Sequence, residues 1–291
     1  MAIKCMGKKN VIFAVAVLLV TLFGVADTCM AATIRAGANG QSIQGAIDAA
    51  APGDLVLVAD GEYTENISIT KQILLHGVSS DTDSKDTGVV IVARDAALPV
   101  VKVEGTTGVT IDGINVKGSI GEAGILVLGS SKTTVTRSSA VENRIGISLV
   151  NSESSIITNN RTEFNETYGI YLERSNENTV TENRSGQNRD KGIFLSYANR
   201  NEISANSTNH NVWNGILLWD SDDNRITDNE AYRNMYSIIE SESTGNLYDD
   251  NSTLPNLYII LPIIMTYTGI IFYLLQRLII GRILGLIGKK E

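Results

Sequence analysis

One tetrapeptide, repeated at a fixed spacing, decides the fold of this 291-residue chain. Its glycines are 23 residues apart in three consecutive copies: Gly169-Ile170-Tyr171-Leu172, Gly192-Ile193-Phe194-Leu195 and Gly215-Ile216-Leu217-Leu218. Two earlier copies begin at Gly124 and Gly146, and a degenerate copy, Ser237-Ile238-Ile239, follows them. Self-similarity at a fixed period of this size indicates a solenoid or a related repeat architecture.

Three series of asparagines keep the same spacing and reinforce the repeat. Their members are Asn160, Asn183, Asn206 and Asn229; Asn165, Asn188, Asn211 and Asn234; and Asn178, Asn201 and Asn224. We expect these asparagines to be structural, because side chains stacked in register can form hydrogen-bonded ladders along a solenoid. Asparagine also tolerates the left-handed backbone conformation of tight bends, so we expect the ladder asparagines to occupy such bends.

The repeat unit predicts strands rather than helices. Asn, Ser and Thr are abundant in each unit, and Ile170 and Leu172, two positions apart, must share one side of a strand. Coils stacked about 4.8 Å apart pair each strand with its copy in the next coil, and connections between parallel strands are right-handed. The predicted fold is therefore all-β: a right-handed single-stranded parallel β-helix with about 23 residues per coil.

The β-helix is expected to cover residues 32–252, with the regular coils at 121–252. Before them, the pattern is looser, and strand-like runs occur at 55–58, 66–69, 73–75, 89–92, 100–103 and 109–111. In residues 42–50, Ile43, Ala46, Ile47 and Ala50 have helical spacing. We expect a short amphipathic helix there, because a solenoid needs a cap over its first coil.

Both ends of the chain indicate export and membrane attachment. Residues 1–31 have the order of a signal peptide, with lysines, a 16-residue apolar run and small residues; an uncleaved signal anchor is the alternative. Residues 257–275 carry no charge and are followed by a basic tail at 276–291. This predicts one C-terminal transmembrane helix with a cytoplasmic C-terminus and an extracytoplasmic body, a buried core helix being the alternative.

Charge and cysteine content exclude several functions. Residues 33–256 hold 17 basic and 30 acidic side chains, and this excess of acid disfavours nucleic acid as a partner. Both cysteines, Cys5 and Cys29, lie in the predicted signal peptide. A mature body without thiols excludes disulfides, zinc–thiolate sites and cysteine catalysis. The oligomeric state is not predicted.

One stretch near the N-terminus resembles a known family. Its residues are Ser42-Ile43-Gln44, Ala46-Ile47, Ala50, Pro52-Gly53-Asp54, Val58, Gly61-Glu62-Tyr63, Glu65-Asn66 and Leu75-His76-Gly77. They look like the opening of pectate-lyase-like β-helix proteins, and with the Asn-rich repeats the chain most resembles the NosD-like group. The resemblance implies relatives that include polysaccharide lyases, hydrolases, epimerases and a periplasmic accessory protein associated with copper-site maturation.

The residues themselves give little support to catalysis or metal binding. No complete catalytic constellation is found, so the chain is expected to bind rather than to catalyse. Copper prefers His, Met or Cys ligands, and only His76, His210 and Met235 occur between the two apolar ends. Asp220, Asp222 and Asp223 form the densest acidic patch, which is either a solvated turn or a weak calcium site.

A row of apolar side chains is the strongest candidate for a binding surface. If the Ile and Leu of each tetrapeptide point inward, the residues between them point outward. The predicted exposed stripe consists of Tyr171, Phe194, Leu217 and Trp219. We expect it to bind a glycan or polysaccharide, or to be covered by a loop, the tail or a second copy; a lyase or epimerase and a metal-accessory or structural scaffold are the alternatives. Asn66 and Asn251 are the candidate glycosylation sites.

Overall fold

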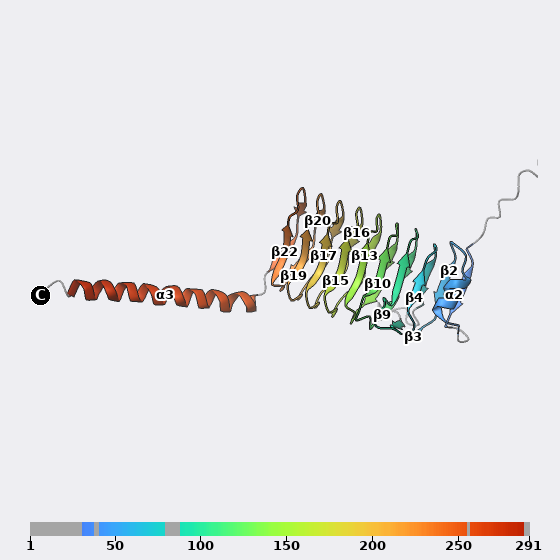
Figure 1. Cartoon of the computed structure of the whole chain (residues 1–291), viewed down its shortest axis with the longest axis horizontal. Coiled ribbons are helices and arrows are strands. Elements are labelled where there is room, and N and C mark those ends of the chain that lie inside the picture. The colour runs from blue at the N-terminus through green and yellow to red at the C-terminus, as the bar shows by residue number, and fades with distance from the viewer. Residues whose placement is uncertain (1–30, 38–40, 79–87, 255–256, 288–291) are drawn as a thin grey trace, which may run out of the picture. The chain divides into compact units, whose positions relative to one another are not determined.

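The computed structural model describes residues 31–37, 41–78, 88–254 and 257–287, and its body is a parallel β-solenoid (Figure 1). Its strands form three sides, named here sheets A, B and C, and every strand pair that the structure describes is parallel. The predicted signal peptide at 1–31 falls almost wholly outside the described residues. The prediction that the coil is right-handed rests on a general rule: connections between parallel strands of one sheet are almost always right-handed.

Each sheet takes one strand from successive coils. Sheet A contains β1 (Thr33–Ala36), β2 (Leu55–Val58), β5 (Leu74–Gly77), β8 (Thr110–Asp112), β11 (Thr134–Thr136), β14 (Ile156–Thr158), β16 (Thr179–Thr181), β18 (Glu202–Ser204), β20 (Arg225–Thr227) and β23 (Leu247–Asp249). Sheet C contains β4 (Ile67–Ile69), β7 (Val101–Glu104), β10 (Ala123–Leu128), β13 (Ile145–Val150), β15 (Tyr168–Glu173), β17 (Lys191–Ser196), β19 (Asn214–Trp219) and β22 (Tyr236–Ser241).

Sheet B is the most interrupted side. It contains β3 (Gly61–Thr64), β6 (Val89–Val92), β9 (Asn115–Lys117) and β12 (Ser139–Ala140), and further along β21 (Glu230–Tyr232) pairs with β24 (Ser252–Leu254). Between these two groups, single bridges continue the side from coil to coil through Arg161, Arg184 and Ser207. Sheet B is therefore reduced to a narrow seam in the middle coils.

The predicted register of the repeat is confirmed. Ile170 pairs with Ile193, which pairs with Ile216, and all three are fully buried. The outward residues of the same strands pair with one another in the same way, Tyr171 with Phe194 and Phe194 with Leu217. The constant period of the repeat thus places chemically equivalent side chains directly above one another.

The cap helix is present at the predicted place. Helix α2 (Ile43–Ala49) begins after Ser42, whose side chain accepts a hydrogen bond from the Gly45 amide, and it buries Ile43, Ala46 and Ile47. Glu65 adds a second cap, because its two carboxylate oxygens accept from the amides of Ile43 and Gln44, each at 3.0 Å. The buried Glu65 therefore has a structural role.

The asparagines form ladders along the coils. Asn183 Nδ2 donates to Asn206 Oδ1 at 3.0 Å, and Asn160 Nδ2 donates to Asn183 Oδ1 at the same distance. Equivalent bonds join Asn165 to Asn188 and Asn178 to Asn201. Nearly all the amide nitrogens in these ladders also donate to a backbone carbonyl, as Asn183 does to Ile157. The ladders thus satisfy buried backbone groups that the short strands leave without partners.

One expectation about the asparagines was wrong. The left-handed positions are not occupied by the ladder asparagines but by the residues immediately before them, such as Glu177, Glu182 and Gln187, each with φ of 57°. The left-handed residue turns the chain, and the asparagine after it points inward, where its amide can bond. The bend and the ladder are therefore two adjacent positions, and the bend position accepts many residue types.

Helix α3 (Leu257–Ile287) follows the solenoid in the sequence and contains Pro262. In the part of the chain that the structure describes, no helix combines the length and apolarity needed to cross a membrane. The prediction of a transmembrane helix at 257–275 therefore has no support from the structure.

Candidate functional site

The outer face of sheet C carries the predicted apolar row. Strand pairing aligns Leu126, Ser148, Tyr171, Phe194, Leu217 and Ile239 in one row. A second row two residues further along each strand holds Leu128, Val150, Glu173, Ser196, Trp219 and Ser241. The two rows lie side by side because alternate residues of a strand point to the same face.

Three aromatic rings pack together on this face: Tyr171 and Phe194 of the first row, and Tyr168 beside them. The rings of Tyr171 and Phe194 stack with centroids 5.2 Å apart and an angle of 23°. Tyr168 lies 5.3 Å from Tyr171 and 5.2 Å from Phe194, and Lys191 Nζ lies 5.1 Å from the centre of the Phe194 ring. Phe194 is consequently only 7% exposed, so the prediction that it is open to solvent was wrong: its neighbours on the same face cover it.

Two rings on neighbouring coils are exposed together on this face, as is Ile239 at the end of the first row. Trp219 is 42% exposed and Tyr197 is 44% exposed, and their ring centroids lie 6.2 Å apart. Arg174 lies over the Tyr197 ring, with Cζ 5.6 Å from the ring centre, and its Nη1 donates to Glu173 at 2.7 Å. Such a placement of a guanidinium over a ring is a cation–π contact. Leu217 is half-buried between this pair and Phe194. We name Tyr197 and Trp219 the open ring pair.

Tyr197 was absent from the predicted stripe although the repeat contains a signal for it. It occupies the left-handed bend position, with φ of 53°, directly after the strand, and Arg174 and Asp220 occupy the equivalent positions of the neighbouring coils. Bend residues do not follow the alternation of a strand, so a rule based on alternate positions passes over them. Extending each row by one bend residue would have included it.

Tyr171 contributes a hydroxyl that keeps its proton. Burial raises the pKa of Tyr171 to about 12, and the nearby negative charge of Glu173 acts in the same direction. Burial also raises the pKa of Tyr168. Both phenols keep their protons at physiological pH, as an ordinary tyrosine does, and can donate hydrogen bonds on this face.

The acidic patch is placed at a corner of the solenoid. Asp220 and Asp223 occupy left-handed bends, and Asp222 Oδ1 accepts hydrogen bonds from the amide of Thr244 at 2.6 Å and from its hydroxyl at 3.1 Å. Asp222 thus joins its own coil to the next one through these two hydrogen bonds to Thr244. In the described ranges, no group of three or more His, Cys, Asp and Glu side chains could hold a metal ion, so the structure gives no support to the predicted calcium site.

The two histidines lie in different surroundings. His76 Nδ1 is 2.9 Å from Asp112 Oδ2 on the outer face of sheet A, and Arg137 Nε donates to Asp112 Oδ1 at 2.8 Å. His210 lies at a bend, with Nε2 3.2 Å from Arg233 Nη1. Each imidazole thus has an arginine nearby, whose positive charge disfavours a metal cation. The residues present do not fit a copper site.

The cluster of His76, Asp112 and Arg137 was missed at the sequence level. His76 and Asp112 are paired in register although 36 residues separate them, and 25 residues separate Asp112 from Arg137. Coil lengths in this half of the solenoid are irregular, so the period gave no means of aligning the three. The buried Asp112 fixes both partners, and its hydrogen bond raises the already high pKa of Arg137.

The two candidate glycosylation asparagines have engaged side chains. Asn66 Nδ2 donates to the carbonyl of Pro99 at 2.8 Å, and its Oδ1 accepts from the Asp95 amide at 2.7 Å. Asn251 continues a ladder, because its Oδ1 accepts from Asn229 Nδ2 at 3.0 Å and its Nδ2 donates to the Ile226 carbonyl at 2.7 Å. Asn251 is therefore the last member of the ladder that runs through Asn229, near the end of the stack.

These features define a class: a parallel β-solenoid with ladder asparagines inside and an aromatic surface on one sheet. A family model described as "Periplasmic copper-binding protein (NosD)" matches residues 80–258, and the chain belongs to the NosD family. The search of curated proteins found no match.

Solved structures show the same fold at low sequence identity. The periplasmic alginate epimerase AlgG is similar with a TM-score of 0.50 and 17% identity, covering 70% of this chain and 61% of the epimerase. ORF18 of Geobacillus virus E2 is similar with a TM-score of 0.51 and 12% identity, covering 87% of this chain and 65% of the viral chain. The chain thus spans about three fifths of the length of the epimerase, and at these identities the likeness extends to the fold alone.

Proposed function

We propose that this protein is an extracytoplasmic solenoid that binds a glycan on the outer face of sheet C. The observation that carries the proposal is the open ring pair, Tyr197 and Trp219, exposed next to each other on adjacent coils. Apolar rings exposed together on a surface indicate a contact site, and the C–H faces of sugar rings pack well on aromatic faces. The extracytoplasmic location is supported by the family, whose description is periplasmic.

The surroundings of the open ring pair suit a polar polymer. Arg174, Glu173 and the protonated phenol of Tyr171 offer donors and acceptors beside the rings, as a ligand rich in hydroxyl groups requires. The row runs along the solenoid axis, from coil to coil, so its direction favours a linear chain over a compact ligand. Because the structurally similar protein is an alginate epimerase, alginate belongs among the polymers to be tested.

Copper binding, which the family description states, is not what these residues support. The histidine ring nitrogens at His76 and His210 lie beside Asp112 with Arg137 and beside Arg233, and no thiol occurs after Cys29. Catalysis on a polysaccharide stays the alternative that the sequence leaves open, and membrane attachment through residues 257–275 stays a prediction from the sequence.

The test uses the full chain and a panel of linear glycans, including alginate, in an array followed by calorimetry. Trp219→Ala and Tyr197→Ala should each weaken binding about 10-fold, the equivalent of about 1.4 kcal/mol. Phe164→Ala is the matched control, because Phe164 is also an exposed ring (48%) at a left-handed bend (φ 58°) with an arginine 5.8 Å from its centre, but it lies in the bend between the sheet B bridge at Arg161 and β15, not after a strand of sheet C.

Two results would count against the proposal. Either the chain retains none of the glycans, or Phe164→Ala weakens binding as much as Tyr197→Ala does. The first would leave the open ring pair without a ligand of this class, and the second would show that any exposed ring on the solenoid has the same effect.

A further inference from the structure

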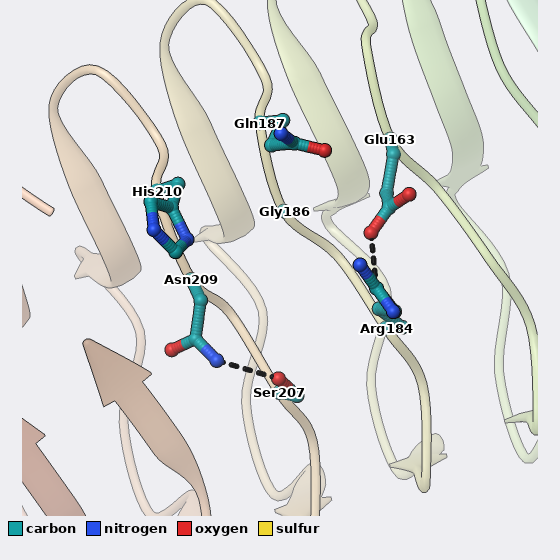
Figure 2. A pocket seen from close by; sticks show the side chains of 7 residues that line it. All are labelled: Glu163, Arg184, Gly186, Gln187, Ser207, Asn209 and His210. Carbon is teal, nitrogen blue, oxygen red and sulfur yellow. Dashed lines mark hydrogen bonds and ion pairs between the residues drawn. The ribbon is translucent and has the colours of Figure 1, made fainter. Parts of the chain in front are cut away.

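A cavity on the sheet B side arises from one missing side chain. Glu163, Gly186, Asn209 and Tyr232 occupy equivalent positions of four consecutive coils. Because Gly186 has no side chain, a cavity of about 300 Å³ opens between Glu163 and Asn209 (Figure 2). Glycine is required there, since a Cβ atom would lie 2.5 Å from the Asn209 carbonyl oxygen. The close approach of the two coils thus requires glycine, and the side chain that glycine lacks leaves the cavity.

A buried carboxylate holds the arginine of this cavity. Glu163 is 1% exposed, and its two carboxylate oxygens each bind the Nε of one arginine: Arg161, at 2.7 Å, and Arg184 (Figure 2). The bond through Nε fixes the plane of the Arg184 guanidinium, while 70% of its side chain stays exposed. An arginine oriented in this way presents its terminal N–H groups as a fixed fork, the geometry that matches an oxyanion.

The local charge favours an anion over a cation. Two arginines share one carboxylate, and Arg233 adds a third positive charge beside His210 on the rim; Glu230, which pairs with Ser207 in the next coil, offsets one of them and leaves a net excess of one positive charge. This positive site lies in a body whose overall charge is strongly negative. A metal ion would be repelled from such a site, and an oxyanion would be attracted to it.

Neutral donors complete the lining. Asn209 Nδ2 donates to the Ser207 hydroxyl oxygen at 2.8 Å (Figure 2). Asn209 Oδ1 accepts from the Tyr232 amide at 2.6 Å. A hydroxyl that accepts a bond from one side still has its own proton to donate. Gln187 and His210 lie on the bend side of the same cavity.

We infer that the cavity beside Gly186 binds an oxyanion, a carboxylate, sulfate or phosphate group, between the Arg184 guanidinium and the Ser207 hydroxyl. The volume accommodates the group alone or as part of one anionic sugar unit. This site goes beyond the proposed function, because it lies on sheet B and uses no residue of the open ring pair.

The experiment titrates the full chain at low ionic strength with three probes: sodium sulfate, inorganic phosphate and the methyl glycoside of glucuronic acid. Calorimetry measures affinity, and the rise in the unfolding midpoint with probe concentration gives an independent readout. Arg184→Gln should weaken binding at least about 10-fold, because it removes a charge-assisted pair of hydrogen bonds. Arg200→Gln, which removes the same charge at an exposed pair with Glu177, should leave the affinity unchanged.

Two further variants separate position from charge. Ser207→Ala removes the hydroxyl donor of the site and leaves the ion pairs of Glu163 intact, so it should also weaken binding. It therefore tests the site even if Arg184→Gln fails to fold. Glu163→Gln makes the cavity more positive but leaves only one oxygen to accept from the two arginines, so at least one of them is released and we expect weaker binding. Tighter binding by Glu163→Gln would show that Glu163 does not position the arginines and would overturn the geometric argument.

The pattern across probes identifies the source of the oxyanion. Binding of the glucuronide alone indicates a sugar carboxylate, and binding of sulfate or phosphate indicates a free or esterified inorganic group; either result supports the site. The inference is overturned if no probe binds at millimolar concentration, or if Arg200→Gln lowers the affinity as much as Arg184→Gln does.

Discussion

Replacing one ladder asparagine, Asn183→Ala, should be among the most destabilising single changes in the solenoid. Asn183 is 2% exposed and lies in the middle of its ladder. Its Nδ2 donates to the carbonyls of Ile157 and Thr181 and to Asn206 Oδ1, at 2.8, 2.9 and 3.0 Å. Its Oδ1 accepts from both the amide and the side chain of Asn160, each at 3.0 Å.

The size of the effect follows from the groups that lose their partner. Alanine leaves the buried Asn160 amide and the Ile157 carbonyl without these hydrogen bonds, while Asn206 Oδ1 still accepts from the Asn183 amide. A buried polar group without a partner costs roughly 1–3 kcal/mol. Two such groups and the small cavity left by the side chain predict a loss of about 4 kcal/mol in the free energy of unfolding.

Chemical denaturation, followed by circular dichroism, measures this loss. Asn159→Ala is the control: Asn159 is adjacent in sequence, but its side chain is exposed and donates to Thr158 Oγ1 and Glu182 at the surface. Asn159 has a left-handed φ of 55°. This conformation favours asparagine slightly, so the control should lose about 1 kcal/mol or less. If Asn183→Ala costs no more than Asn159→Ala, the ladders do not stabilise the stack and the reasoning is wrong.

Two further predictions concern packing and pH. A Cβ at Gly192 would lie 2.6 Å from the Gly215 carbonyl oxygen, whereas Gly129 has open space around it and a left-handed φ. In unfolding experiments Gly192→Ala should therefore cost about 3 kcal/mol or more and Gly129→Ala only about 1 kcal/mol; equal losses would contradict the packing argument. Since the pKa of Tyr171 is raised from 10.0 to about 12 in the folded protein, its protonated form contributes stability that is present below about pH 10 and lost as the pH rises toward about 12. Tyr171→Phe should reduce this alkaline loss of stability, and an unchanged unfolding curve between about pH 10 and about pH 12 would refute the assignment.

Sequence periodicity was enough to predict the fold because its physical cause is simple. A residue and its copy one period later are hydrogen-bonded neighbours, so each inward position must remain compatible with the one above it. The cap helix was predictable for a similar reason, since Ile43, Ala46 and Ile47 had to share one face. Strand β3 was not predicted, because Gly61–Thr64 alternates between partly and fully exposed residues and has no apolar pattern.

The candidate sites were harder to predict because they depend on departures from the repeat. The cavity exists because glycine stands at 186 where Glu163 and Asn209 have side chains in the flanking coils. The covering of Phe194 depends on Tyr168 and Lys191, which come from a third position of the same strands. The alternation of a strand indicates which side a residue faces, but exposure depends on the size of its neighbours.

The ladders also set the unit in which this protein can grow or shrink. Nearly every ladder bond of the middle coils joins residues 23 apart, and at the Asn229–Asn251 and Asn224–Asn246 steps the separation is 22. A deletion or duplication of one whole coil would therefore rejoin all three ladders and both rows of sheet C, whereas a shift of several residues inside a strand would interrupt them together. Length variation among such chains should accordingly be counted in coils, and each added coil would extend the outer face of sheet C by one strand.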